Sequence, residues 1–99
     1  MSAATRKQYF YVEIENPTTS YKDTNQSHAI QFSSRYMKMI VEGAGGVIEY
    51  SLIGANNSEI DGVIKTTDGV VDFTGLETQK IAVRRKAGTV SSVRVWAWK

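Results

Sequence analysis

Strict alternation of side-chain character over residues 80–98 is the feature that most limits how this chain can fold. Every second residue is small or apolar, namely Ile81, Val83, Val93, Val95 and Ala97. A period of two is typical of β-strands with one buried face. The glycine-containing segment 86–89 predicts a tight turn, and therefore a hairpin. Trp96 and Trp98 then lie on the face opposite the buried one, where large aromatic side chains usually indicate a binding partner.

Shorter segments along the rest of the chain repeat this alternation. We expect strands over residues 8–15, 28–32, 36–42, 47–52, 62–66 and 70–73. Asn16-Pro17 ends the first of these, and a polar loop covers residues 16–27. Gly43–Gly46 predicts a further turn, and Asp68-Gly69 predicts a hairpin. No segment has apolar residues at helical spacing, so we expect no substantial helix.

About seven to eight short strands with turn signals between them predict an all-β fold, an antiparallel β-sandwich. Jelly-roll and immunoglobulin-like topologies both remain open. The inward member of each alternating run predicts a core of Phe10, Val12, Ile14, Ile48, Tyr50, Leu52, Phe73, Ile81, Val83, Val93 and Val95. Met37, Met39 and Val41 are also placed to face inward.

Ninety-nine residues are enough for one domain with its own core. We expect a flexible arm at residues 1–7 and a single domain at residues 8–99. The chain has no cysteine, which excludes disulfides and thiolate metal sites. No apolar run is long enough to cross a membrane, and residues 1–7 do not resemble a signal peptide. The net charge of +2 does not favour nucleic-acid binding.

The chain offers no convincing set of catalytic residues. His28 is its one histidine, and it lies among serines beside the polar loop, where a rim position is more common than an oriented general base. Glu13 and Glu15 share one strand face and are expected to be solvated. Gly43–Gly46 lacks the lysine and the following helix of a phosphate-binding loop. We therefore expect no enzyme activity and no cofactor.

Oxygen-bearing side chains between Asn57 and Asp68 loosely match the spacing of a calcium-binding loop. Glu59 and Asp61 fall at two of the ligand positions, and Gly62 falls at the glycine position. Asn57 and Asp68 are not the usual residues at the first and last positions, and the flanking helices are missing. We therefore expect no metal site here.

Two groups of residues are candidates for a protein interface. Arg84, Arg85 and Lys86 form a basic cluster, and we expect Arg94 across the hairpin from it. A solvated hairpin tip that discourages edge-to-edge pairing is the alternative. Trp96 and Trp98 could complete a second apolar layer, stack on sugar rings, or anchor a protein interface, where tryptophan is enriched.

A series of strand and turn residues in the second half supports a specific resemblance. It comprises residues 48–57 (IEYSLIGANN), Gly62, residues 71–76 (VDFTGL), residues 80–84 (KIAVR) and residues 93–98 (VRVWAW). This pattern, over residues 47–98, resembles small virion proteins of tailed bacteriophages. The resemblance implies a β-sandwich and a small accessory structural protein present in many copies. A capsid decoration (cement) protein or another head, neck or tail component fits this description.

The resemblance and the residues together lead to one expected function. We expect a non-enzymatic virion protein that is made in the host cytoplasm, forms a homo-oligomer and binds other virion proteins, in particular the major capsid protein. The alternative is a carbohydrate-binding or receptor-binding β module that uses Trp96 and Trp98 as stacking platforms. A small enzyme is disfavoured.

Overall fold

The computed structural model describes residues 8–99, and the arm predicted at residues 1–7 lies outside this range. Four strands are present: β1 (Tyr9–Glu15), β2 (Ser27–Ser51), β3 (Gly62–Lys65) and β4 (Val70–Trp98). A 3-10 turn, η1 (Thr66–Asp68), is the one helical element of the described residues. The fold is therefore all-β, as predicted. In the described range, no helix is long and apolar enough to cross a membrane.

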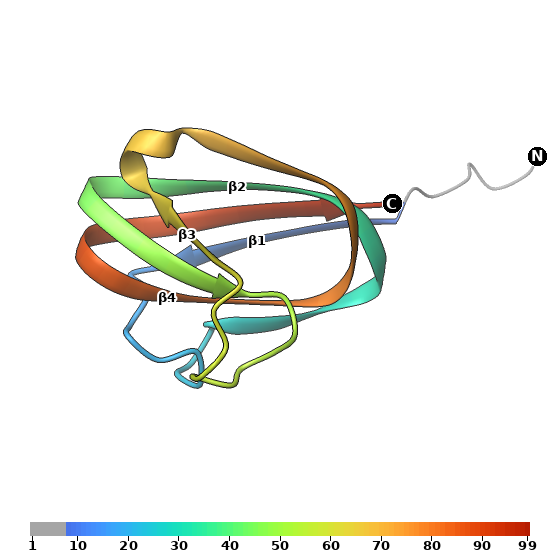
Figure 1. Cartoon of the computed structure of the whole chain (residues 1–99), viewed down its shortest axis with the longest axis horizontal. Helices are drawn as coiled ribbons and strands as arrows, with labels where there is room; N and C mark the ends of the chain where they lie inside the picture. Colours follow the sequence, from blue (N-terminus) through green and yellow to red (C-terminus); the bar gives the residue numbers. More distant parts are fainter. Residues whose placement is uncertain (1–7) are drawn as a thin grey trace, which may run out of the picture.

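The predicted sandwich of seven to eight strands is wrong. The four strands form one sheet in the order β1-β4-β2-β3 (Figure 1). The hydrogen-bonded ladder continues through the glycine-containing turns that predicted strand ends. As a result, β2 runs through Gly43–Gly46, and β4 runs through Gly75 and Gly88, each as one element.

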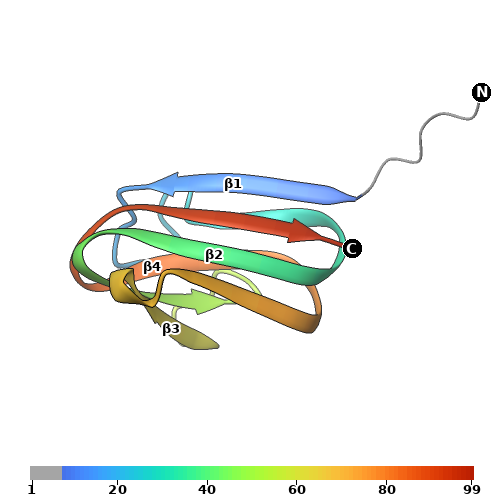
Figure 2. The same cartoon turned by 90° about the horizontal axis from the view of Figure 1, so that it is seen from above.

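The two long strands bend, and this lets one sheet enclose a core. Met37 of β2 pairs with both Phe73 and Ala97 of β4, whereas Tyr50 of β2 pairs with Val83. Residue numbers rise along β2 as they fall along β4, so the paired segments run antiparallel. Figures 1 and 2 show the ribbons of β2 and β4 curving back at the ends of the molecule.

Both predicted hairpins form turns, but the strands on either side of each turn do not pair with each other. Asp68-Gly69 joins β3 to β4, and both of these strands pair with β2 instead. In β4, residues 82–87 pair with β2. On their other side they contact the loop that precedes β2, where Val83 N–H donates to the Gln26 carbonyl at 3.0 Å. Residues 92–98 lie between β1 and β2. Each arm of the expected terminal hairpin therefore has other neighbours on both sides.

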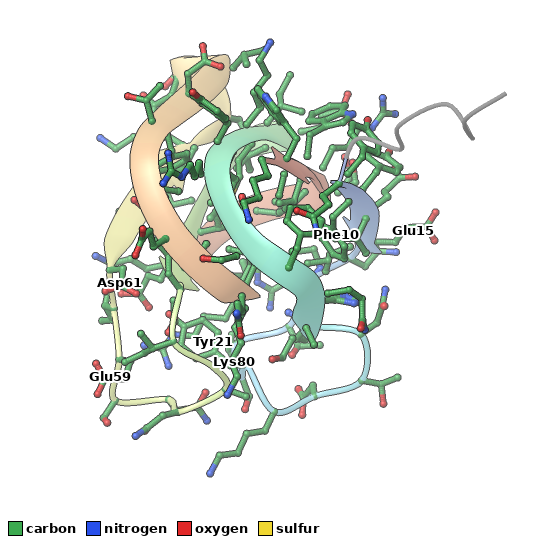
Figure 3. All side chains as sticks on the ribbon, turned by 90° about the vertical axis from the view of Figure 1, so that its right-hand side faces the viewer. Phe10, Glu15, Tyr21, Glu59, Asp61 and Lys80 are labelled. Carbon is green, nitrogen blue, oxygen red and sulfur yellow. The ribbon has the colours of Figure 1, made fainter. Side chains whose placement is uncertain are left out.

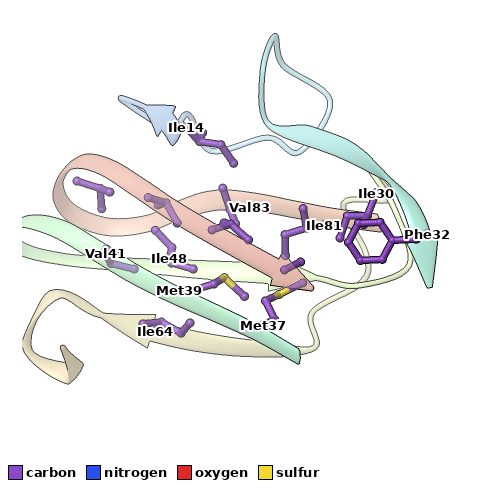
Figure 4. Close-up of a cluster of buried hydrophobic side chains, with 14 residues drawn as sticks. Ile14, Ile30, Phe32, Met37, Met39, Val41, Ile48, Ile64, Ile81 and Val83 are labelled. Atoms are coloured by element: carbon purple, nitrogen blue, oxygen red, sulfur yellow. The ribbon is translucent and has the colours of Figure 1, made fainter. Parts of the chain in front are cut away.

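The predicted inward faces are confirmed. Ile14, Ile48, Ile81, Val83, Val93 and Val95 are fully buried, and Phe10, Val12, Tyr50, Leu52 and Phe73 pack against them. Met37 and Met39 are fully buried as well. Figure 4 shows the buried members of this core, among them Ile14, Met37 and Val83, gathered between the ribbons of the curled sheet. The alternation therefore predicts correctly which side of each strand faces the core.

Candidate functional site

The outward side of β1, β2 and the last part of β4 carries a cluster of aromatic residues that we call the aromatic face. Its members are Tyr9, Tyr11, Tyr36, Trp96 and Trp98. They alternate with inward residues such as Val12, Met37 and Val95, so the pleat directs them to the other side of the sheet. The tyrosines are exposed by 60%, 44% and 40% in chain order, and both tryptophans are half-buried.

The strand register brings these rings together from three segments of the chain. Tyr9 lies opposite Trp98, and Tyr11 lies opposite Trp96, across the β1–β4 ladder. On the other side of the same part of β4, Tyr36 of β2 lies opposite Trp98. Directly opposed side chains in a sheet are within contact distance. The aromatic face is therefore continuous across three neighbouring strand segments.

Contacts between the rings hold the two tryptophans in place. The ring centroids of Tyr11 and Trp96 are 5.2 Å apart, with the planes tilted by 44°. Those of Tyr36 and Trp98 are 5.7 Å apart and nearly parallel, at 18°. Both distances fall in the range of favourable aromatic pairs. The face is thus a preordered surface, which lowers the entropy cost of binding.

An open groove of about 560 Å³ crosses the aromatic face. Lys38 Nζ lies 5.9 Å from the centroid of the Trp98 ring, a cation–π distance. The same nitrogen lies 4.0 Å from Asp72 Oδ1. The groove therefore combines apolar walls with a cation that can pair with an acidic or aromatic group. It is lined by Tyr9, Lys38, Val70, Trp96 and Trp98.

Charged residues adjoin the aromatic face on its β1 and β2 sides. Arg94 Nε lies 3.1 Å from Glu42 Oε1 and 3.5 Å from Glu13 Oε2. Ser92 Oγ donates a hydrogen bond to Glu42 Oε1 at 2.9 Å. Arg94 thus lies on the same sheet face as Trp96 and Trp98 and bridges β1 to β2. Such a polar border is typical of the rim of a protein interface.

Arg84 lies in a different place and does not join Arg94. Its Nε donates to Glu49 Oε1 at 2.9 Å, and its Nη1 donates to the Asn57 carbonyl at 2.7 Å. Its Cζ lies 4.5 Å from the centroid of the Tyr21 ring. The guanidinium therefore holds two loops onto the sheet.

Arg85 and Lys86 are exposed near the turn at Gly88. The structure thus splits the predicted interface residues into three places: Trp96, Trp98 and Arg94 on one face, Arg84 beneath the loops, and Arg85 with Lys86 at a turn. The basic cluster expected from the sequence does not include Arg94, because Arg84 and Arg94 have different strand neighbours.

Tyr21 anchors the loop between β1 and β2, a role that the alternation of side chains does not predict. It is fully buried, and its N–H donates to Asn57 Oδ1 at 2.9 Å. Figure 3 shows Tyr21 turned inward between this loop and the loop that carries Glu59 and Asp61. Burial raises the pKa of the Tyr21 hydroxyl above its ordinary value, and the Arg84 charge partly opposes this. Among the described residues, its hydroxyl has no hydrogen-bond partner.

The candidate catalytic and metal-binding side chains have structural contacts. His28 Nε2 lies 3.1 Å from the carbonyl oxygen of Asn25. Asp61 Oδ2 accepts the Leu52 N–H at 2.6 Å, and Asp68 Oδ2 accepts the Lys65 N–H at 2.8 Å. Within residues 8–99, no three His, Asp or Glu side chains lie close enough to hold a metal ion. The two carboxylates stabilise turns of the loop that resembled a calcium site.

Sequence reasoning missed four residues of this site: Tyr9, Tyr11, Tyr36 and Lys38. Tyr9 and Tyr11 alternate with the predicted core residues Phe10 and Val12 and so fall on the outward side, but the alternation gives no information on which strand lies beside β1. That neighbour is the segment containing Trp96 and Trp98. A count of outward aromatic residues on every strand is the signal that could have found the cluster.

Comparison with known proteins supports the fold. No family model and no curated protein sequence matches the chain. Among solved structures, the SPBc2 prophage-derived protein YomS matches with a TM-score of 0.56 and 14% identity, and all of both chains is covered. PliG of Aeromonas hydrophila, a periplasmic inhibitor of g-type lysozyme, matches with a TM-score of 0.54 and 13% identity over 100% of this chain and 93% of that one. These similarities show a shared fold.

Proposed function

We propose that this chain is a non-enzymatic accessory protein of a bacteriophage particle and docks onto a protein lattice through its aromatic face. A capsid decoration protein that binds the major capsid protein is the form of this role we favour, and another head, neck or tail component is the broader one. On this proposal the protein is made in the host cytoplasm and resides in the virion.

The aromatic face is the observation that carries the proposal. Five aromatic side chains lie on one side of three adjacent strand segments, and Tyr9 alone is 60% exposed. A soluble protein rarely leaves such a surface uncovered without a partner. Tyrosine and tryptophan, together with the nearby Arg94, are the residue types enriched in interface hot spots.

Two further observations support a phage origin. Residues 47–98 resemble small virion proteins of tailed phages in their strand and turn residues. One solved protein of the same fold is described as prophage-derived. The name of the other, a lysozyme inhibitor, describes a binding function and not catalysis. These names support a structural or binding role for the fold without identifying the partner.

A carbohydrate-binding or receptor-binding module is the second candidate. The groove lined by Tyr9, Trp96 and Trp98 favours it, because exposed aromatic rings stack on the apolar faces of sugars. Lys38, which lines the groove, and its ion-pair partner Asp72 supply a donor and an acceptor for hydroxyl groups. This module would need specific affinity for one oligosaccharide.

Co-sedimentation tests the proposal against this alternative. Capsids of the phage that carries the gene are prepared without this protein and mixed with the purified chain. We expect saturable binding to the capsids and no specific binding on a panel of oligosaccharides. Absence of capsid binding, together with tight binding of one oligosaccharide that is lost in Trp96→Ala, would favour the second candidate.

A further inference from the structure

β1 has one open edge. It is the first strand in the sheet order, and within the described residues its only strand partner is β4. Figure 2 shows β1 as the outermost ribbon on its side of the molecule. The edge is seven residues long, from Tyr9 to Glu15. A row of backbone N–H and C=O groups therefore remains available to another strand.

Hydrogen bonds at the two ends of β1 show which residues face that open edge. Asn16 N–H donates to the Ser91 carbonyl at 2.9 Å, and Lys99 N–H donates to the Gln8 carbonyl at 3.3 Å. Even-numbered residues of β1 therefore direct their backbone groups toward β4, because this direction alternates along an antiparallel strand. The backbone groups that point to the open edge belong to the odd-numbered residues Tyr9, Tyr11, Glu13 and Glu15.

Several of the usual protections of an edge strand are missing from β1, whose charged residues are Glu13, already paired with Arg94, and Glu15. Its sequence, YFYVEIE, contains no proline and no lysine, and its ladder with β4 has no register shift. Proteins commonly protect an edge with such residues or with a bulge. A regular edge of this length, without proline, lysine or a bulge, can accept a strand from another chain.

We propose that two copies of this chain pair their β1 strands antiparallel, about a two-fold axis through Val12, to form one sheet that continues through both subunits. In this register Tyr9 lies opposite Glu15 of the partner subunit, and Tyr11 lies opposite Glu13 of the partner subunit. All outward backbone groups from Tyr9 to Glu15 are then used. No two carboxylates face each other directly, and this avoids like-charge repulsion across the strands.

In the same register, the inward side chains of the two β1 strands also match each other. Phe10 and Val12 are only half-buried, although they lie on the core side, because β1 is at the edge. Val12 lies opposite Val12 of the partner subunit, and Phe10 lies opposite Ile14 of the partner subunit. The pairing therefore covers apolar surface on one side and extends the aromatic face on the other.

Other pairings are less suitable. A shift by one residue places the tyrosines on the core side of the partner sheet. A shift by two residues leaves some outward backbone groups of β1 without partners. The strand at the opposite end of the sheet, β3, is only four residues long and includes Gly62. The interface does not depend on what the aromatic face binds.

Disulfide trapping tests this register directly, because the chain has no native cysteine. At the two-fold axis, Val12 forms a non-hydrogen-bonded pair with itself, with the Cα atoms about 4.5 Å apart, a distance that a disulfide can span. Val12→Cys should cross-link into a covalent dimer under mild oxidation. Gln31→Cys, at an exposed position on β2, is the matched control and should stay monomeric on denaturing gels. Equal cross-linking of the two variants overturns the proposal.

Sedimentation analysis tests the same interface without a covalent bond. The unmodified protein should sediment as a dimer. Tyr11→Glu, which places carboxylates opposite Glu13 of the partner subunit, should lose the dimer and still unfold in one cooperative transition. Tyr36→Glu is the matched control, since it changes a tyrosine of similar exposure away from β1, and it should remain dimeric. A monomeric unmodified protein, or a dimer that survives Tyr11→Glu, overturns the proposal.

Discussion

Arg84 Nε and Glu49 Oε1 lie 2.9 Å apart, and both side chains are largely removed from water, with exposures of 13% and 12%. The pair joins β4 to β2, where Glu49 and Arg84 lie opposite each other in the register. Arg84 Nη1 donates a hydrogen bond to the carbonyl oxygen of Asn57 in the loop between β2 and β3. This single side chain therefore links the sheet to the loop between β2 and β3.

Removing Arg84 should destabilise the protein strongly. Arg84→Ala leaves Glu49 as a nearly buried charge without its partner, and a loss of this kind costs about 3 kcal/mol or more of unfolding free energy. Chemical denaturation measures the loss. Arg85→Ala, at the exposed neighbouring position, is the control and should change stability by less than about 0.5 kcal/mol. Equal stability of the two variants would show that Arg84 does not hold the loops.

Tyr21→Phe should keep or increase stability at neutral pH. The Tyr21 ring is fully buried, but its hydroxyl has no hydrogen-bond partner among the described residues, so removal of the oxygen breaks no such bond. Tyr21→Ala removes the ring and should cost about 3 kcal/mol or more, the usual scale for a buried aromatic. Thermal melting compares the two variants. A large loss in Tyr21→Phe would reveal an unseen partner, such as a buried water.

The raised pKa of Tyr21 also predicts how stability changes in alkali. The unfolded chain loses this proton near pH 10.0, whereas the folded protein retains it to higher pH because burial disfavours the phenolate. Stability is therefore fully present below that pH and falls as pH rises above it. Tyr21→Phe should melt with a shallower pH dependence in this range, and the remaining slope should include Tyr50, whose pKa burial also raises. The same dependence of stability on pH in Tyr21→Phe and in the unmodified protein would contradict a raised pKa for Tyr21.

At Gly88 an added side chain has two separate costs: the strain of a positive φ and a collision with a neighbouring strand segment. Gly88 and Gly69 both have positive φ, at 69° and 67°. A Cβ at Gly88 would collide with the carbonyl oxygen of Gly45, whereas a Cβ at Gly69 meets nothing within 4 Å. Gly88→Ala should therefore lower the melting temperature clearly more than Gly69→Ala. Similar losses would mean that β2 and β4 do not approach closely at this turn.

The same change, valine to aspartate, should have opposite outcomes on the inward face of β4 and at an exposed position of β3. Val95 is fully buried, whereas Val63 of β3 is 43% exposed. Val95→Asp should unfold the domain, because an unpaired buried charge costs several kcal/mol against a total stability of about 5–15 kcal/mol. Val63→Asp should remain folded by circular dichroism. A folded Val95→Asp variant would show that the inward and outward faces of β4 have been assigned the wrong way round.

Local alternation and strand pairing differ in how well the sequence predicts them. The inward positions, such as Val83 and Val95, followed correctly from the alternation, because the period of two depends on neighbouring residues alone. The partners of each strand did not follow, because the turns at Asp68-Gly69 and at Gly88 redirect the chain toward distant segments. The predicted number of strands was wrong for the same reason, since β2 and β4 continue through their glycines.

The candidate site was predictable in part. The alternation placed Trp96 and Trp98 together on one outward face, whereas Arg94, expected beside Arg84, borders that face instead. Tyr9, Tyr11 and Tyr36 joined them only through the register of β1 and β2 against β4. Tyr21 was missed because it lies in a polar loop without periodicity, and its burial depends on Arg84 and Asn57 from distant segments.

The affinity of Trp98→Ala for phage capsids tests the central claim most directly. Trp98 lies at the centre of the aromatic face, between Tyr9 and Tyr36 in the register. Its removal should weaken binding by about 2 kcal/mol or more, roughly thirtyfold in Kd, while the protein stays folded. Ile53→Ala, which removes an equally apolar side chain with 61% exposure away from this face, should bind like the unmodified protein. A Trp98→Ala variant that binds capsids as tightly as the unmodified chain would contradict docking through the aromatic face.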